Sequence, residues 1–446
     1  MLCNSYGSDE ATIRSLITKY TQVHLAGNSY NVVLEDMGLD SLQATELSTA
    51  LKRQFNTKIL PDILLISTIS HVLQLLARPL DALAQADASF RTFAKKRGYT
   101  NYWIDVAPLF DELLLSYILE AFAALSINLA AINEGNVITD IAHLPKYDRL
   151  LERLKIFLAS RNLILQLDDK FVRSRTSIEV RPSAQLNAAL RELFPQYSPE
   201  TELLNLVGPR LAECVSGETN PITIMFGNLP ALRIMEDFYA NSPMMSTLTD
   251  QLVEFLSIFI RSKNGSHVQK PLRILEIGAG TGGTTTRLVE MLQSIGCLTQ
   301  YTFTDISAAF VSQAKRKYKQ YPWIDFSVLN LEEELEVQWK GQYDVVIGAN
   351  VVHATSDRAA TCRRLRTTLR EGGFLVLSEI TRAISWYDIC FGLLDGWWLA
   401  EEGKGYPIQP AEAWMSTFRS AGFTRVGFSW GENLEANSQQ LLVGCN

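Results

Sequence analysis

The stretch at residues 275–284, LEIGAGTGGT, decides the fold of this chain. An apolar run precedes it and a helix-forming run follows it, so it is expected to join a strand to a helix. Glycines at Gly278, Gly280 and Gly283 allow a tight turn and let a ligand approach the backbone closely. Their spacing matches the G-x-G-x-x-G pattern of nucleotide-cofactor sites, which carries weight only with support from its surroundings.

Strands and helices alternate from residue 271 onward, which predicts an α/β domain with a mainly parallel sheet. The last two strands are expected to form an antiparallel hairpin appended to that sheet. The candidate strands lie at residues 273–277, 301–305, 326–329, 345–349, 374–379, 425–430 and 440–443.

Glu276 points to the kind of cofactor. It stands two residues before Gly278, where a carboxylate can face an ammonium group but would be unwelcome beside a pyrophosphate. Together with the appended hairpin, this favours a class I (Rossmann-like) S-adenosylmethionine site over a nicotinamide-dependent reductase, which stays open as a weaker alternative. An ordinary strand-to-helix turn is the bland alternative. The loop residues expected to hold the cofactor are Gly278, Ala279, Gly280, Thr281 and Gly282.

Three residues after later strands are further candidates for the cofactor site. Asp305 ends the next strand about twenty residues after the glycines, where an acid accepts hydrogen bonds from ribose hydroxyls. Asn330 follows the third strand and is a candidate for the adenine edge, and Asn350 follows the fourth. Asp305 could instead only cap its loop.

His353 and Glu379 form the candidate catalytic pair. His353 falls just past the end of the fourth strand and Glu379 closes the fifth. Adjacent strands lie about 4.8 Å apart, so the two side chains can meet above the sheet. A carboxylate on one imidazole nitrogen fixes the tautomer and raises the basicity of the other, as abstraction of a C–H proton requires. Their alternatives are a capping histidine and a capping glutamate. Trp397 and Trp398 would wall an apolar channel or pack in a core.

A helix at residues 147–160, followed by short strands at 164–167 and 171–173, predicts a winged-helix-like element. Such elements often bind DNA, but Asp168 and Asp169 in the turn favour a packing or lid role.

The composition bounds the remaining possibilities. A chain of 446 residues with 47% hydrophobic and 20% charged residues predicts two or three globular domains. A net charge of −7 disfavours a protein that follows nucleic-acid phosphates. The six scattered cysteines predict neither disulfides nor a zinc site. With no long apolar run and no signal-like start, we expect a cytoplasmic protein without a metal or a membrane span.

A small helical unit is expected at residues 9–77, with apolar runs at 13–20 and 42–55 and short helices near 63–66 and 72–76. Within it, MGLDSL at residues 37–42 places Ser41 at the start of a helix, among acidic residues. This looks like the 4′-phosphopantetheine attachment site of an acyl carrier domain. Asp40 and Ser41 would alternatively only cap the helix. Residues 78–89 read as a linker.

Taken together, these motifs resemble the acyl carrier and C-methyltransferase region of fungal non-reducing polyketide synthases. The resemblance implies a carrier (1–77), a linker (78–89), a mainly helical lid (90–240) and a methyltransferase domain (241–446). It implies that His353 and Glu379 serve α-carbon deprotonation and that Tyr239 reaches the cofactor or substrate. The substrate would be a β-ketoacyl thioester on phosphopantetheine, and the partners would be other synthase domains.

Two rival functions remain at this stage. One is an O-methyltransferase in which His353 deprotonates a phenol. The other is a non-catalytic module that docks carrier domains.

Overall fold

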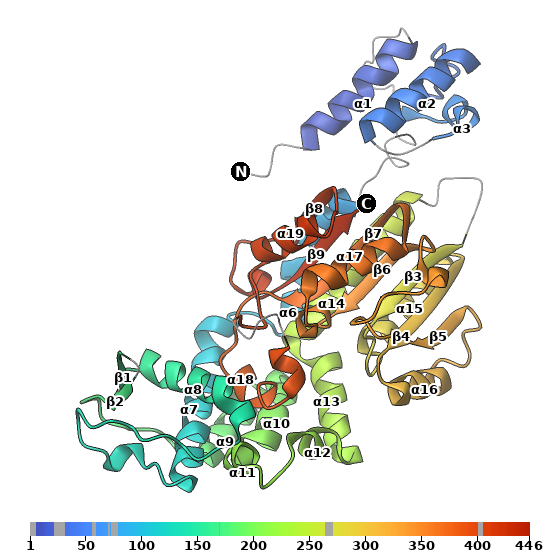
Figure 1. Cartoon of the computed structure of the whole chain (residues 1–446). Helices are drawn as coiled ribbons and strands as arrows, with labels where there is room; N and C mark the ends of the chain where they lie inside the picture. The colour runs from blue at the N-terminus through green and yellow to red at the C-terminus, as the bar shows by residue number, and fades with distance from the viewer. Residues whose placement is uncertain are drawn as a thin grey trace.

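The computed structural model describes residues 6–21, 32–55, 59–69, 72, 79–168, 170–263, 271–399 and 405–446. Along the chain follow a small helical group, a mainly helical part, and a sheet with helices on both faces (Figure 1). No helix in these ranges is long and apolar enough to cross a membrane.

The described residues contain one large sheet of seven strands, in the order β5-β4-β3-β6-β7-β9-β8. The pairs from β5 to β7 are parallel, and β9 is antiparallel to both β7 and β8. The mainly parallel sheet and its antiparallel C-terminal pair are therefore confirmed. The order reverses between β3 and β6, and ligands bind at such a switch point. The strands are β3 (Leu272–Ile277), β4 (Thr299–Asp305), β5 (Ile324–Val328), β6 (Tyr343–Ala349), β7 (Leu369–Ile380), β8 (Arg425–Phe428) and β9 (Gln439–Cys445).

Both faces of the sheet are covered because successive side chains of a strand point to opposite faces. On β6, Val345 and Ile347 belong to one apolar cluster and Val346 to another. The first cluster includes side chains of α14 and α15, and the second includes side chains of α17 and α19. The helices are α14 (Pro243–Lys263), α15 (Gly283–Ile295), α16 (Ala308–Lys317), α17 (Arg358–Thr368) and α19 (Ala411–Ser420).

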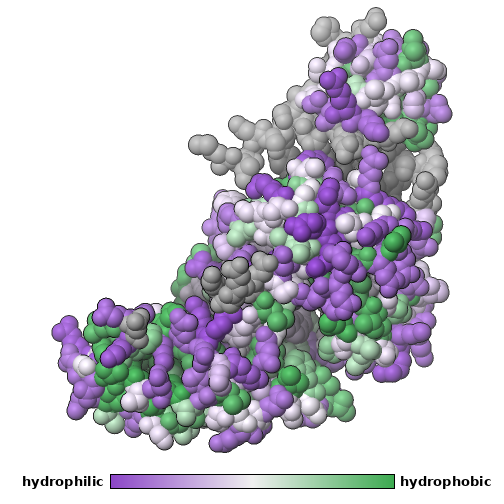
Figure 2. Space-filling view, viewed as in Figure 1, coloured by the Kyte–Doolittle hydropathy of each residue, from purple (hydrophilic) through white to green (hydrophobic). Residues whose placement is uncertain are grey.

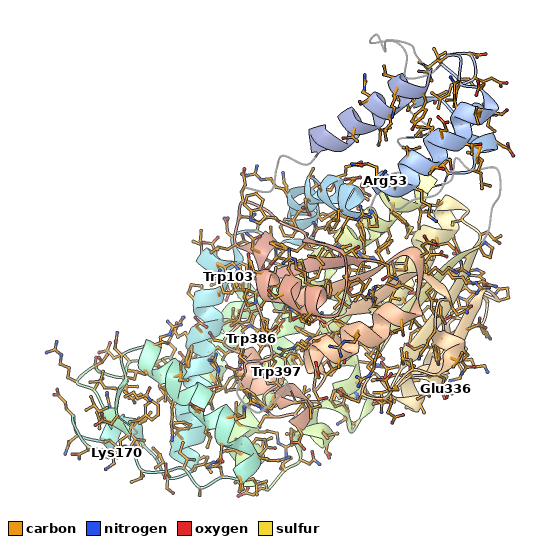
Figure 3. The ribbon with its side chains drawn as sticks, turned by 45° about the horizontal axis from the view of Figure 1, so that its top comes forward. Arg53, Trp103, Lys170, Glu336, Trp386 and Trp397 are labelled. Carbon is orange, nitrogen blue, oxygen red and sulfur yellow. The ribbon has the colours of Figure 1, made fainter. Side chains whose placement is uncertain are left out.

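The helical part shares one core with the segment that follows β7. Figure 3 places Trp386 and Trp397 of that segment where the helical part meets the sheet. Trp386 stacks on Phe110 of α7, with ring centroids 5.5 Å apart. The helices of this part are α6 (Phe90–Arg97), a π-helix (Tyr102–Val106), α7 (Ala107–Ala124), α8 (Asp148–Ser160), α9 (Ser183–Leu193), α10 (Ser198–Val207), α11 (Leu211–Ser216), α12 (Pro221–Phe226) and α13 (Leu229–Asn241). The segment after β7 contributes α18 (Tyr387–Cys390). Short 3₁₀ turns along the chain lie at Leu129–Ala131, Pro145–Tyr147, Pro195–Tyr197, Gly208–Arg210, Val337–Trp339, Val352–Ala354, Asp395–Trp398 and Glu435–Asn437.

The winged-helix-like element is present. Helix α8 leads into an antiparallel hairpin of β1 (Ile164–Leu167) and β2 (Lys170–Arg173). Asp168 adopts a left-handed turn conformation, with φ of 52°, whereas Asp169 lies outside the described residues. Leu165 and Leu167 of the hairpin are exposed, and Figure 2 shows apolar surface over this end of the molecule.

The small N-terminal group contains α1 (Tyr6–Thr21), α2 (Ser41–Phe55) and α3 (Pro61–Leu65) around a core of its own. Asp40 accepts a hydrogen bond from the Gln43 amide (2.8 Å), and Gln43 accepts one from the Asp40 amide (2.9 Å). Asp40 is thus the predicted N-cap. Leu42, expected on the apolar face, is 71% exposed because it lies in the first turn beside Ser41. Residues 73–76 of the expected last helix lie outside the described ranges.

The expected linker at residues 78–89 is wrong in its central part, which forms helix α5 (Pro79–Asp87). Ala82, Leu83 and Ala86 are buried and join the apolar cluster that contains side chains of α14. Asp87 then accepts hydrogen bonds from the Gln251 side chain (2.9 Å) and the Trp430 amide (3.1 Å). The polar composition hid the helix, although alanine is the best helix former.

Candidate active site

The glycine loop joins β3 to α15 at the switch point of the sheet. Gly278, Gly280 and Gly282 have φ values of 55°, 56° and 78°, which favour glycine. A Cβ on Gly278 would lie 2.3 Å from a methyl of Val351, so the loop packs directly against the segment after β6. A Cβ on Gly280 would meet no atom closer than 4.0 Å. The loop is therefore fixed on one side and open on the other.

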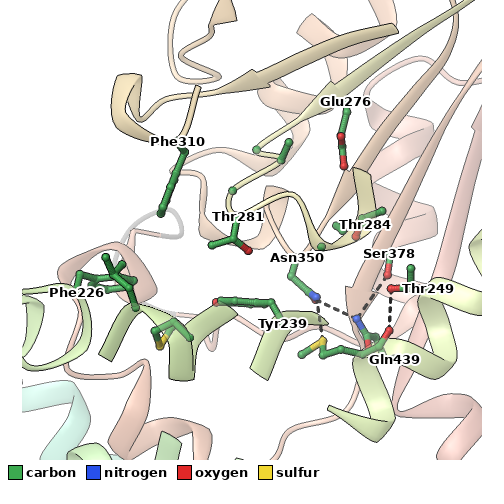
Figure 4. A pocket seen from close by; sticks show the side chains of 18 residues that line it. Phe226, Tyr239, Thr249, Glu276, Thr281, Thr284, Phe310, Asn350, Ser378 and Gln439 are labelled. Atoms are coloured by element: carbon green, nitrogen blue, oxygen red, sulfur yellow. Dashed lines mark hydrogen bonds between the residues drawn. The ribbon is translucent and has the colours of Figure 1, made fainter. Parts of the chain in front are cut away.

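The open side faces a cavity of about 230 Å³, here called the cofactor cavity (Figure 4). Apolar side chains from α12, α13 and α16 and polar groups from the ends of the strands line it. The predicted residues Glu276, Gly278, Ala279, Gly280, Thr281, Tyr239 and Asn350 are all among the lining residues. Sequence positions more than a hundred residues apart thus meet at one site.

Glu276 is 2% exposed and presents a buried carboxyl group to this cavity. Its Oε2 accepts hydrogen bonds from the hydroxyls of Thr285 (2.6 Å) and Tyr301 (2.7 Å). Burial raises the pKa of Glu276 to about 7, with a smaller contribution from Asp305 in the same direction. A buried carboxylate that ionises reluctantly suits a cationic ligand group, which restores the charged form. The residue fits the ammonium group of S-adenosylmethionine.

The side chains of Asp305 and Asn330 form hydrogen bonds with residues of the neighbouring loops. Asp305 Oδ2 accepts a hydrogen bond from the Gly280 amide (2.9 Å), and Oδ1 accepts one from the Ser307 amide (2.8 Å). A carboxylate has further lone pairs, so binding of ribose hydroxyls stays a prediction. Asn330 caps its loop through Glu332 and Glu333. Neither residue is among those that line the cofactor cavity.

Gln439 lines the cofactor cavity, and sequence reasoning missed it. Its amide nitrogen donates to Asn350 Oδ1 (3.3 Å), and its Oε1 is buried without a partner among the described residues. Little in the sequence indicates this role, because Gln439 begins the antiparallel strand β9 and belongs to no recognised motif. Asn350 adopts φ of 51°, a conformation that asparagine tolerates better than most residues.

His353 and Glu379 form the pair that the strand order predicts. His353 Nδ1 lies 2.6 Å from Glu379 Oε2, and Glu379 Oε1 accepts the amides of Val351 (3.2 Å) and Val352 (3.0 Å). Glu379 has no exposed surface. One carboxylate therefore fixes both the imidazole and the backbone that carries it. With Nδ1 engaged, Nε2 is the ring nitrogen left for chemistry.

His353 lines a second cavity of about 210 Å³, here called the substrate chamber. Tyr239, Met245 and Asn350 line both this chamber and the cofactor cavity, so the two adjoin. The rest of its lining is mostly apolar and includes Phe238, Tyr387, Phe391, Leu394 and Trp397. The Trp397 ring meets that of His353 edge-on, with centroids 5.8 Å apart. Trp397 lines the chamber and also belongs to the buried apolar core of the helical part, so both alternatives considered for it apply.

Ser41 is exposed at the first position of α2. Because the side chain of Asp40 caps this helix, the Ser41 hydroxyl is not needed for capping. An exposed hydroxyl at a helix N-terminus suits a phosphodiester, whose charge the helix dipole favours. The position therefore fits a phosphopantetheine arm.

A Rossmann-like sheet, a glycine loop and an acidic residue facing the cavity define a methyltransferase that uses S-adenosylmethionine. The family described as "Methyltransferase domain" matches residues 275–375, and "Methyltransferase, Helix-turn-helix domain" matches 84–171. "Phosphopantetheine attachment site" matches residues 11–76. The chain thus combines a phosphopantetheine carrier with a methyltransferase.

The comparison with known proteins narrows this class. The citrinin polyketide synthase CMeT domain is similar in structure, with a TM-score of 0.79 and 30% identity over 82% of this chain and 96% of that one. The CurJ carbon methyltransferase follows, with a TM-score of 0.71 and 26% identity over 82% of this chain and 99% of that one. In sequence, the chain is 40% identical over 366 residues to the non-reducing polyketide synthase atr1 of Stereocaulon alpinum, and 36% identical over 369 residues to the 5-methylorsellinic acid synthase of Aspergillus terreus.

The chain belongs to the carbon-methyltransferase (CMeT) family of polyketide synthases and carries a phosphopantetheine carrier domain. The two sequence matches cover 82% and 83% of this chain but only 14% of each relative. The chain therefore spans about a seventh of the length of these relatives.

Proposed function

We propose that the chain methylates the α-carbon of a β-ketoacyl thioester carried on a phosphopantetheine arm. The observation that carries the proposal is the buried His353–Glu379 pair in an apolar chamber that adjoins the cofactor cavity. Carbon methylation needs a base beside the methyl donor, and this geometry supplies one.

His353 acts as the base through Nε2. A β-ketone acidifies the neighbouring α-carbon, so an imidazole is strong enough to remove its proton. Glu379 holds Nδ1–H and stabilises the imidazolium that forms when the proton arrives. Because Glu379 also binds two backbone amides, the ring is already oriented before the substrate enters.

When bound, S-adenosylmethionine would supply an electrophilic methyl group and would leave as S-adenosylhomocysteine. Glu276 and the glycine loop hold its amino-acid end, with Asp305 at the ribose, while Asn330 stays our candidate for the adenine edge. Tyr239 and Asn350 lie at the junction of the two cavities, where donor and acceptor must approach. Much of the acceleration follows from this alignment, because two held reactants need no further encounter.

The arm on Ser41 delivers the thioester, and residues 90–240 form the lid over the chamber. We keep the proposed limits of the carrier at 1–77 and of the methyltransferase domain at 241–446. Helix α5 packs with the sheet, so the connection between carrier and enzyme is shorter than 78–89. The partners are the other domains of a polyketide synthase, which build the chain that the thioester carries.

Mass spectrometry of a β-ketoacyl thioester, incubated with the purified chain and methyl-labelled S-adenosylmethionine, tests this function. We expect the labelled methyl on the α-carbon. A label on oxygen would replace the proposal with O-methylation. Cofactor binding without transfer to any thioester would leave the chain a carrier-docking module.

A further inference from the structure

One wall of the substrate chamber belongs to the segment after β7. Phe391, Leu394 and Trp397, here called the aromatic wall, line the chamber, and Trp397 contacts the ring of His353. Phe391 and Trp397 stack on each other with centroids 5.6 Å apart. The space around the base therefore depends on where this segment is held.

Arg149 of α8 binds the backbone beside the aromatic wall. Its Nη1 donates to the Trp398 carbonyl (2.9 Å) and its Nη2 to the Gly405 carbonyl (2.5 Å). The guanidinium also lies over the Trp398 ring, 4.7 Å from its centroid. One planar group thus joins two chain positions that follow the wall, which the rigid fork of arginine allows and a lysine cannot reproduce.

Arg153, one turn further along α8, binds the start of the same segment. Its Nε donates to Asp388 Oδ2 (3.2 Å), and the Tyr406 hydroxyl donates to Asp388 Oδ1 (2.8 Å). Asp388 is only 4% exposed, whereas 32% of the Arg153 side chain stays exposed, so the carboxylate is the buried partner of this ion pair. A Cβ on Gly392 would lie 3.2 Å from Leu150, which shows how closely α8 approaches the wall.

Helix α8 precedes the β1–β2 hairpin, the place of the DNA-reading helix in a winged-helix protein. Its three cations are nevertheless all engaged within the chain. Arg149 and Arg153 bind the segment around the wall, and Lys155 Nζ lies 3.8 Å from Asp140. Arg149 and Arg153 are thus turned toward the protein itself, whereas DNA-reading helices direct such side chains to phosphates and bases.

We infer that Arg149 and Arg153 are positioning residues for methyl transfer. They hold the aromatic wall against His353 and thereby keep the base aligned in the apolar chamber. Neither touches a reacting atom, and the inference rests on the proposed function, in which His353 is the base and a β-ketoacyl thioester is the substrate.

Two measurements on the full chain test this inference. In R149A and R153A, kcat for the β-ketoacyl thioester should fall tenfold or more, because small misplacements of a base are costly. The dissociation constant of S-adenosylhomocysteine should not change, since the cofactor cavity is lined by other elements. R149K should recover part of kcat, because it keeps a cation over Trp398 but cannot span two carbonyls. K155A, on the same helix, is the matched control and should behave like the parent.

Hydrogen–deuterium exchange supplies a readout that needs no turnover. The amides of Leu394 and Trp397 are bonded within the wall segment, and they should exchange faster in R149A than in the parent. The glycine loop should exchange at the parent's rate. If the parent methylates no thioester, the proposed substrate fails while this comparison still tests whether Arg149 holds the aromatic wall.

Unchanged kcat together with unchanged wall exchange in R149A would overturn the inference. So would a parallel loss of kcat, cofactor affinity and melting temperature, because that pattern marks a general folding role. If R149A does not fold, R149K carries the same test.

Discussion

At the scale of single residues, the proposed base His353 and its carboxylate Glu379 are the part of the site whose proximity the sequence predicted best. His353 follows β6 and Glu379 lies at the end of the adjacent parallel strand β7, so strand order alone brings them together. Asn330 illustrates the limit of the same reasoning. It also follows a strand, but nearby Glu332 and Glu333 bind its side chain, and such local loop geometry has no periodic pattern. Gln439 was missed because an amide on an antiparallel strand matches no motif.

Replacing the proposed base should lower turnover strongly and leave cofactor affinity unchanged. H353A should lower methyl transfer by roughly 10²–10⁴-fold, the usual contribution of a general base. E379Q should also be impaired, because an amide nitrogen facing Nδ1 would place the ring proton on Nε2. Single-turnover rates and S-adenosylhomocysteine titration measure both variants. Normal turnover in H353A would show that His353 is not the general base.

Glu276 predicts how cofactor affinity depends on pH. Its pKa is raised to about 7 by burial, so the free protein carries a protonated Glu276 below that pH. A cationic ligand binds the ionised form, and the affinity should therefore rise from pH 6 to pH 8. Of the nearby charges, Asp305 raises the pKa of Glu276 and Lys317 lowers it.

Calorimetric titration of S-adenosylhomocysteine across this pH range checks the prediction. E276Q should bind more weakly at pH 8 and lose the pH dependence. E290Q, an exposed carboxylate on α15, is the control and should retain it. A flat profile in the parent would contradict the assignment of Glu276 to the ammonium group.

At the scale of elements, periodicity predicted the strands well because strands buried on both faces leave uninterrupted apolar runs. The winged-helix-like element also follows from its sequence, since α8 buries Leu150, Leu151, Leu154 and Leu158 at helical spacing. Helix α5 was not predicted from the sequence. Alanine makes up much of its buried face, and a search for large hydrophobic residues at helical spacing does not detect it. Its partners lie in distant parts of the chain, and no local pattern reveals them.

The glycine loop and the segment after β6 form one packed unit, which a pair of substitutions can demonstrate. G278A places a methyl group 2.3 Å from Val351, whose amide binds Glu379. G296A has an equally left-handed backbone but open space around it. Each should lose about 1–2 kcal/mol of stability from backbone strain.

Only G278A should also lose cofactor affinity and turnover. Chemical denaturation and S-adenosylhomocysteine titration of both variants separate the two effects. Equal behaviour of the two variants would show that the close approach to Val351 has no functional weight.

At the scale of the whole molecule, a carrier and a methyltransferase stand in one chain, each with its own core. The sequence suggested this division because the carrier motif and the glycine loop lie far apart. It could not show that the helical part shares its core with the segment after β7, since that contact joins residues more than two hundred positions apart.

Loading of the carrier and methyl transfer should therefore be separable. S41A should accept no phosphopantetheine label from a phosphopantetheinyl transferase, yet methylate a free thioester at the parent's rate. T45A, an exposed hydroxyl one turn along α2, should load normally. Intact-mass measurement reports loading, and a label on S41A would exclude Ser41 as the attachment site.

The hydrogen bond between Asp87 and the Trp430 amide spans 343 residues. Ribosomes add about 5–20 residues per second, so α5 waits roughly 20–70 s for this partner during synthesis. Ala82, Leu83 and Ala86 lack their final packing during that interval. The nascent chain should therefore offer an apolar helix to chaperones until β8 and β9 are made, and slower translation of that last stretch should increase its aggregation.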